Sequence, residues 1–202
     1  MEVGDAPPDW LDMQVQANSL LRDTSAAHFL PRLHYLNKQL RVYTQRNPNG
    51  ALFALFHLSA SEIRLYSATH AMLVSVMCGL AAREVLNWPE ETEAALCLAA
   101  LTMNVGMTEL QDRLAVQMSP PTPEQRIQID QHAVRSVQLL EQLGISDKAW
   151  LEAVSDHHGA PPGPLAGMSD GRRMARLIQR ADMFAARLAP RASRVPTSPA
   201  AA

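Results

Sequence analysis

The chain has 202 residues, of which 47% are hydrophobic and 19% are charged, and its formal net charge is -2. This length and composition are typical of a folded globular protein with a sizeable core. A nearly neutral molecule lacks the strong positive field that favours nucleic acid or an acidic membrane surface. We therefore expect neither nucleic acid nor a membrane surface as its partner.

The two cysteines, Cys78 and Cys97, both lie in apolar segments with helical spacing. This placement favours reduced, buried thiols of a cytoplasmic protein over a disulfide framework. No basic-then-apolar segment of the signal-peptide type opens the chain. The longest apolar run, residues 71–82, is shorter than the roughly 18 residues that a membrane-spanning helix needs. The sequence thus predicts a cytoplasmic protein with no membrane span.

Apolar residues recur with helical spacing along the chain, and no alternating β pattern extends beyond a few residues. A helix is predicted over residues 12–22, followed by helices over 27–46, 51–58, about 60–85, 89–105, 123–143, 147–158 and 171–188. The predicted fold class is therefore all-α, a bundle of about eight to ten helices with no internal repeat.

Three features mark the expected helix boundaries. The sequence NPNG at 47–50 predicts a turn in which proline and glycine supply special backbone angles. Ser59 or Ser61 is expected to cap the long apolar helix that follows. Pro89 is expected at the first position of the next helix, with acidic residues in its first turn.

The chain divides into a flexible tail over 1–11, N-terminal helices over 12–58, a main domain over 59–195 and a disordered tail over 196–202. The N-terminal helices are expected to pack on the main bundle or to form a homodimer surface. No chemistry is assigned to the histidines of these helices.

The histidines of the main domain are distributed over three of its predicted helices. His70 lies early in the long apolar helix, His132 follows the proline-rich break at 119–123, and His157 and His158 end the next helix. Asp182 lies among apolar neighbours in the last helix, where a buried carboxylate needs a partner. A shared metal ion is one such partner, since imidazoles and carboxylates are common ligands. The alternative is ordinary core histidines bound by hydrogen bonds.

Five motifs follow one another in a recognisable order. They are YSATHAMLVSV around His70, AALTMNVGM at 99–107, PPTPEQRIQIDQH ending at His132, the pair His157-His158, and ADMFAARLAPRASR, which holds Asp182, Arg191 and Arg194. This order resembles the HD-domain phosphohydrolases, and specifically the HD-GYP cyclic-di-GMP phosphodiesterases, over residues 60–195. The resemblance implies an HD-domain-like bundle. It also implies metal ligands at His70, His132, His157, His158 and Asp182, with substrate phosphate bound by Arg191 and Arg194.

The catalytic motif itself departs from the family. Met103 and Asn104 stand where the family carries its His-Asp pair, and Met107 stands in place of a lysine. Gly159 replaces a glutamate, and the Gly-Tyr-Pro loop keeps only Gly-Pro, at 163–164. In two-metal hydrolysis a shared carboxylate holds two cations roughly 3.5–4 Å apart. Asn104 offers one neutral oxygen and Met103 a soft thioether, so the bridge is lost.

The remaining residues divide unequally between the two metal positions that the resemblance implies. The first would keep His70 and Asp182, too few ligands for tight binding. The second would keep three histidines, which suffice for one divalent ion such as zinc, manganese or iron with an open position.

Three hypotheses follow. The first is a catalytically impaired regulatory module that binds a metal, a cyclic dinucleotide or other phosphate ligand, or a signalling protein partner. The second is an active single-metal phosphohydrolase that uses the remaining histidines. The third is a metal-free helical interaction domain with a purely structural role.

Overall fold

The computed structural model describes residues 6–25, 27–159 and 163–192, and these residues are mostly helical. The helices are α1 (Trp10–Arg22), α2 (Phe29–Arg46), α3 (Pro48–Ser61), α4 (Tyr66–Leu80), α5 (Glu90–Thr102), α6 (Thr108–Val116), α7 (Pro123–Gln142), α8 (Lys148–Asp156) and α9 (Asp170–Leu188). Short 3-10 helices, η1 (Ile63–Leu65) and η3 (Val105–Met107), and a π-helical turn, η2 (Ala81–Val85), connect some of them. The prediction of an all-α helix bundle is confirmed, and no β-sheet occurs in the described ranges.

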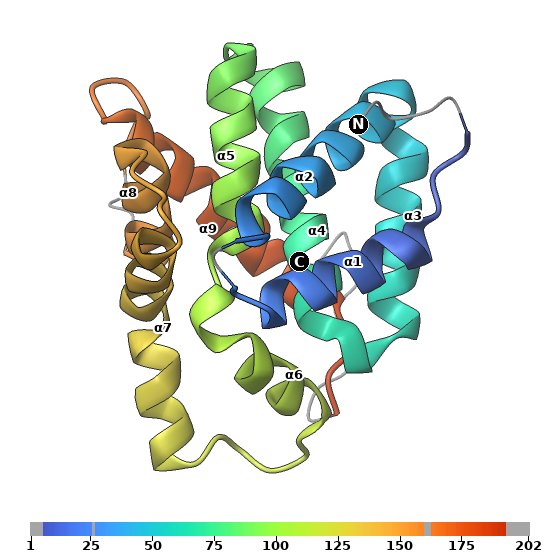
Figure 1. Cartoon of the computed structure of the whole chain (residues 1–202), viewed down its shortest axis with the longest axis vertical. Coiled ribbons are helices and arrows are strands. Elements are labelled where there is room, and N and C mark those ends of the chain that lie inside the picture. The colour runs from blue at the N-terminus through green and yellow to red at the C-terminus, as the bar shows by residue number, and fades with distance from the viewer. Residues whose placement is uncertain (1–5, 26, 160–162, 193–202) are drawn as a thin grey trace.

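The fold is organised around α4, which is mostly apolar and is buried on nearly every side. Helices α1, α2, α3, α5, α6 and α9 all pack against it, as Figure 1 shows for α1 and α2, which cross in front of it. Met72, Leu73 and Val74 are fully buried there. A helix without a polar face is stable in water only when neighbours cover it on all sides. The surrounding helices therefore owe their arrangement to α4.

One continuous helical segment, Ile63–Val85, is 23 residues long and apolar enough to cross a membrane by length and composition. The apolar run at 71–82, which is too short by itself to span a membrane, is part of this longer helix, which extends on both sides of it. Its most apolar window is 78% buried inside the protein. This burial accounts for its composition as that of a core helix.

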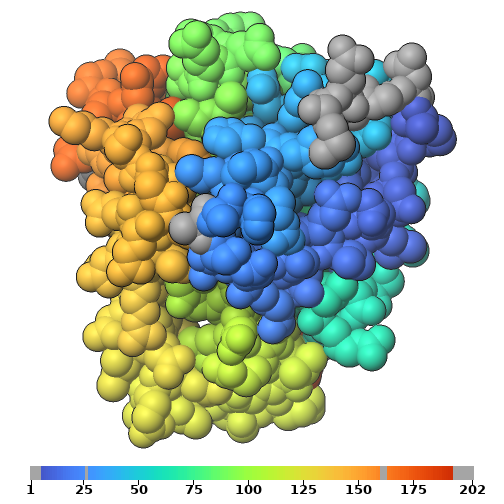
Figure 2. Space-filling view, in the orientation of Figure 1, coloured from blue at the N-terminus to red at the C-terminus, as the bar shows by residue number. Residues whose placement is uncertain are grey.

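The N-terminal helices belong to the same hydrophobic core as the rest of the chain. Met13 of α1, Leu36 of α2 and Leu55 of α3 join one buried cluster with α4, α5, α8 and α9. Figure 2 shows α2 on the front of the molecule, between α1 and the helices α7 and α8. Helix α1 begins at Trp10, two residues before the predicted start, because Asp9 accepts a hydrogen bond from the backbone N–H of Asp12.

Several predicted boundaries are wrong. NPNG is not an open turn: Asn47 alone separates α2 from α3, and its side chain caps α3 by accepting from Gly50 N at 2.9 Å. Pro48 is then the first helical residue, where its missing N–H costs nothing. No serine caps α4, since Ser61 ends α3 and donates to the carbonyl of His57. Pro89 lies just before α5 rather than inside it.

Both cysteines are buried free thiols, as the sequence predicts. Burial raises the pKa of the Cys97 thiol to about 12, with a further contribution from the nearby charge of Glu93. A thiol in this state is a poor nucleophile, so both cysteines are core residues.

The turn from α5 to α6 lies directly against α7. Gly106, in η3, donates its backbone N–H to the hydroxyl of Ser136 at 3.0 Å. A Cβ atom at position 106 would lie 2.8 Å from the backbone nitrogen of Ser136, closer than such contacts allow. Ser136 lies one turn after His132 on α7, so this contact sets where the motif segment meets a helix of the candidate site.

Gly106→Ala is therefore expected to lower the free energy of unfolding by about 1–3 kcal/mol, because the added methyl group pushes η3 away from α7. Urea denaturation followed by circular dichroism measures the loss. Gly159→Ala is the matched control, since a Cβ there meets no atom within 4 Å. Equal effects of the two substitutions would contradict the close approach.

Candidate functional site

The residues singled out by the sequence come from four helices that pack on one another. His70 lies on α4, His132 on α7, His157 and His158 follow the last turn of α8, and Asp182 lies on α9. Helix α8 packs on both α7 and α9, and α9 packs on α4. These four helices bring the five side chains into two adjacent groups.

The first group is the histidine cluster, which we define as His132, His157 and His158. One nitrogen from each ring lies within 4.8 Å of the others. His132 and His157 are 3% and 0% exposed, whereas His158 is exposed. The cluster therefore has a buried base and one side open to solvent.

Hydrogen bonds fix which nitrogen of each buried ring faces the cluster. The Nδ1 atoms of His132 and His157 contact the backbone carbonyls of Ile129 and Val154, three residues earlier on their own helices. A carbonyl oxygen only accepts, so each Nδ1 carries the proton and donates it. The two Nε2 atoms then face each other at 3.0 Å.

Both rings are neutral at neutral pH. Burial, together with a smaller effect of the neighbouring His158, lowers the pKa of His157 to about 3. Burial also lowers the pKa of His132. A neutral imidazole protonated at Nδ1 has a lone pair on Nε2, so two lone pairs are directed at each other. Such an arrangement is repulsive unless a cation or a proton lies between them.

This donor set fits a divalent metal ion. Metal-binding histidines commonly donate their second ring nitrogen to a backbone carbonyl, as both rings do here. Two nitrogens on one tetrahedral zinc at about 2.0–2.1 Å each lie about 3.3 Å apart, so the observed separation needs to widen only by a few tenths of an ångström. His158 supplies a third nitrogen, and its exposure leaves a fourth position accessible to solvent. Among the described residues, the histidine cluster is thus a candidate site for one ion.

The second group is a direct pair between His70 and Asp182. His70 Nε2 donates to Asp182 Oδ1 at 2.7 Å, and the two side chains are 3% and 15% exposed. The sequence expectation makes both residues ligands of a first metal. Here each is already the partner of the other, so the carboxylate is satisfied without an ion.

Asp182 also links the pair to the histidine cluster electrostatically. Burial raises the pKa of Asp182, but the hydrogen bond from His70 and the charges of the neighbouring histidines outweigh this effect and lower the pKa overall. The same carboxylate acts in the opposite sense on His132 and His157, where it favours the charged form. Asp182 is therefore an anion close enough to a cation in the cluster to attract it.

Tyr66, one turn before His70 on α4, is a residue of the site that the motif comparison did not single out. Its ring stacks on that of His70 with centroids 5.3 Å apart and planes at 15°. Its hydroxyl accepts a hydrogen bond from Arg191 Nη2 at 2.7 Å, and the guanidinium lies 5.0 Å from the ring centroid. The sequence carries one signal for this contact: Tyr66 precedes His70 by four residues, and residues four apart share a helix face.

Arg191, which the resemblance predicts to bind phosphate, is thus hydrogen-bonded to Tyr66. Its Nε atom is buried without a hydrogen-bond partner among the described residues. Arg194, the other predicted phosphate ligand, lies outside the described residues.

The substituted motif positions differ from one another in their surroundings. Met103 is 1% exposed and belongs to the hydrophobic core. Asn104 is half-buried, and its Oδ1 has no hydrogen-bond partner in the described ranges. Met107 is half-buried, in η3, and lines a surface hollow with Arg113 and Arg135. None of the three offers a charged oxygen or an imidazole.

No protein-family model matches the chain, and neither a curated protein nor a solved structure is detectably similar to it. The resemblance to HD-domain phosphohydrolases therefore remains a prediction that rests on the motifs and on their placement.

His70→Leu is expected to destabilise the protein by about 3 kcal/mol, because it leaves the Asp182 carboxylate without its partner in a mostly buried position. The double replacement His70→Leu with Asp182→Leu should recover much of this loss, since it removes both polar groups together. Urea denaturation of the natural protein, of His70→Leu, of Asp182→Leu and of the double variant measures the coupling. A double variant whose loss equals the sum of the single losses would show that the two side chains act independently.

Proposed function

We propose that this protein is a degenerate relative of the HD-GYP phosphodiesterases that acts as a regulatory module and not as a phosphodiesterase. It holds one divalent metal ion in the histidine cluster and recognises a phosphate-bearing ligand, such as a cyclic dinucleotide, or a signalling protein partner. The supporting observation is the pair of facing Nε2 atoms of His132 and His157, whose other nitrogens donate to carbonyls. We further propose a cytoplasmic location, in line with the burial of the apolar segment Ile63–Val85.

The lack of phosphodiesterase activity follows from the number of cations that the site can hold. Two-metal catalysis clamps both the attacking and the leaving oxygen of a phosphodiester. The second cation would need Asp182 and His70 as ligands, but these two side chains are hydrogen-bonded to each other. It would also need a bridging carboxylate at position 104, where the chain has Asn104. A single ion in the histidine cluster supplies Lewis acidity at one position only.

A single-metal phosphohydrolase is the second candidate. The exposure of His158 favours it, because an ion held there keeps a position open to a small substrate. Hydrolysis of p-nitrophenyl phosphate by the zinc-loaded protein distinguishes the two candidates. Activity that disappears in His132→Ala would support the enzyme, and its absence in the loaded protein supports the regulatory module.

The purified protein is expected to bind one zinc ion per chain, measured by isothermal titration after treatment with a chelator. His157→Ala should weaken binding at least about tenfold, because it removes one ligand and the contact that His157 makes with the ring of His132. His57→Ala is the control, since His57 is exposed on α3 and is not one of the clustered histidines. Undiminished binding by His157→Ala would refute the proposed site.

Restoring the missing pair with Met103→His and Asn104→Asp is expected to raise the number of metal ions bound per chain. A histidine at the buried position 103 needs a partner, so the double variant should be less stable without metal and gain more from Mn²⁺ than the natural sequence does. Thermal unfolding with and without Mn²⁺ measures this difference. An identical response of both proteins would mean that this segment does not face the cluster.

A further inference from the structure

His158 is held in the histidine cluster differently from the other two rings. His132 and His157 are oriented by hydrogen bonds from Nδ1 to carbonyls three residues earlier on their own helices. The ring of His158 has no hydrogen-bond partner in the part of the chain that the structure describes. It contacts the other two rings, with its centroid 4.9 Å from that of His132 and 4.1 Å from that of His157. The position of this third imidazole therefore depends on where the backbone of His158 lies.

The backbone of His158 lies in a turn, beyond the helix that precedes it. Helix α8 ends at Asp156, and residues 157–159 form the turn. Carbonyl groups at the end of a helix have no donor within that helix and need one from elsewhere. Gln179 of α9 supplies a donor, because its Nε2 donates to the carbonyl oxygen of His158 at 3.0 Å. This hydrogen bond fixes the turn to α9.

Gln179 lies on the face of α9 that is turned toward the site. It precedes Asp182 by three residues, and residues three apart share a helix face. The charge of Asp182 favours the charged form of His157, so this face of α9 lies near the cluster. Arg176, three residues before Gln179, donates from Nη2 to the carbonyl of Gly163 at 3.2 Å. Helix α9 thus holds the connection between α8 and α9 at two points.

The need of the carbonyl for a donor does not by itself explain Gln179. The hydrogen bond lies at an exposed position, where water can donate to the carbonyl of His158 equally well. Water does not provide a fixed distance between the turn and α9. Since α9 also carries Asp182, the hydrogen bond sets the position of His158 relative to the anion that attracts a cation in the cluster.

We propose that Gln179 is a positioning residue of the metal site, whose hydrogen bond to the carbonyl of His158 holds this exposed imidazole in place as the third ligand. The proposal rests on the proposed function, because it requires that the histidine cluster binds a metal ion. The three ligands then have two kinds of support. Hydrogen bonds from Nδ1 orient the two buried rings, and a hydrogen bond from α9 positions the exposed one.

Gln179→Met removes the donor, keeps the length of the side chain and adds no charge. The affinity for zinc is expected to fall about threefold to tenfold, the range that corresponds to the net contribution of one hydrogen bond. Isothermal titration of the full chain, treated first with a chelator, measures this loss. Gln138→Met is the matched control, since Gln138 is exposed on α7 and has no hydrogen-bond partner among the described residues.

A double-mutant cycle separates positioning from a general effect on the fold. In a His158→Ala background the ligand that Gln179 positions is absent, so Gln179→Met should cause no further loss of zinc affinity. A general disturbance of α9 would instead lower the affinity by the same factor in both backgrounds. Competition with a chelator of known zinc affinity measures the weaker binding of the His158→Ala proteins.

A natural protein that binds no zinc would overturn both the metal site and the role of Gln179. If the natural protein binds zinc, a loss in Gln179→Met no larger than that in Gln138→Met would overturn the role of Gln179 alone. Equal losses with and without His158 would overturn that role as well. A loss that occurs only when His158 is present supports it.

Discussion

Two short hydrogen bonds, from Nδ1 of His132 and of His157 to carbonyls of their own helices, determine the chemistry that this protein can support. They orient both rings and assign the proton of each ring to the outer nitrogen. As a result, the inner nitrogens present lone pairs to each other at 3.0 Å. Both carbonyls belong to the preceding turn of the same helix, so the orientation survives any small relative movement of α7 and α8. The arrangement that could hold a cation is thus built from local helix geometry.

The packing around α4 determines that His70 and Asp182 pair with each other. Helix α9 lies against α4, and this brings Asp182 within 2.7 Å of His70. A carboxylate so close to an imidazole forms a hydrogen bond at no cost in desolvation beyond that already incurred by burial. The two residues that a first metal would need are consequently joined to each other. Their remaining influence on a cation in the histidine cluster is the charge of Asp182.

The sequence contains the helices and the convergent residues, but not the way in which these residues pair. Apolar periodicity predicts α4, α5, α7 and α9 within a few residues, because a long helix with a buried face leaves a clear pattern. NPNG misleads because Asn47 caps the next helix itself, and a cap and a turn use the same residue types. His70 and Asp182 are 112 positions apart in the chain, and their direct contact depends on how closely α4 and α9 pack, which the sequence pattern does not show. Tyr66 was missed because an aromatic residue one helical turn before a histidine is far more often core than site.

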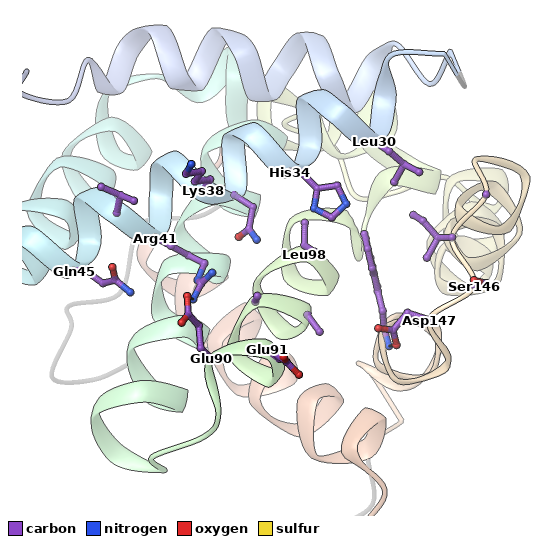
Figure 3. A pocket seen from close by; sticks show the side chains of 17 residues that line it. Leu30, His34, Lys38, Arg41, Gln45, Glu90, Glu91, Leu98, Ser146 and Asp147 are labelled. Carbon is purple, nitrogen blue, oxygen red and sulfur yellow. Dashed lines mark hydrogen bonds and ion pairs between the residues drawn. The ribbon is translucent and has the colours of Figure 1, made fainter. Parts of the chain in front are cut away.

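Helix α8 extends from a surface hollow between α2 and α5 (Figure 3) to the candidate metal site. Trp150 lines the hollow near the start of this helix, and His157 and His158 follow its last turn. The indole of Trp150 is fixed to Thr102, the last residue of α5 before the substituted motif positions. The nine-residue helix α8 therefore separates Trp150, near its start, from the two clustered imidazoles that follow its end. Because α8 packs on α5 and is tied to it by the hydrogen bond from Trp150 to Thr102, the position of α5 helps to set where His157 and His158 lie.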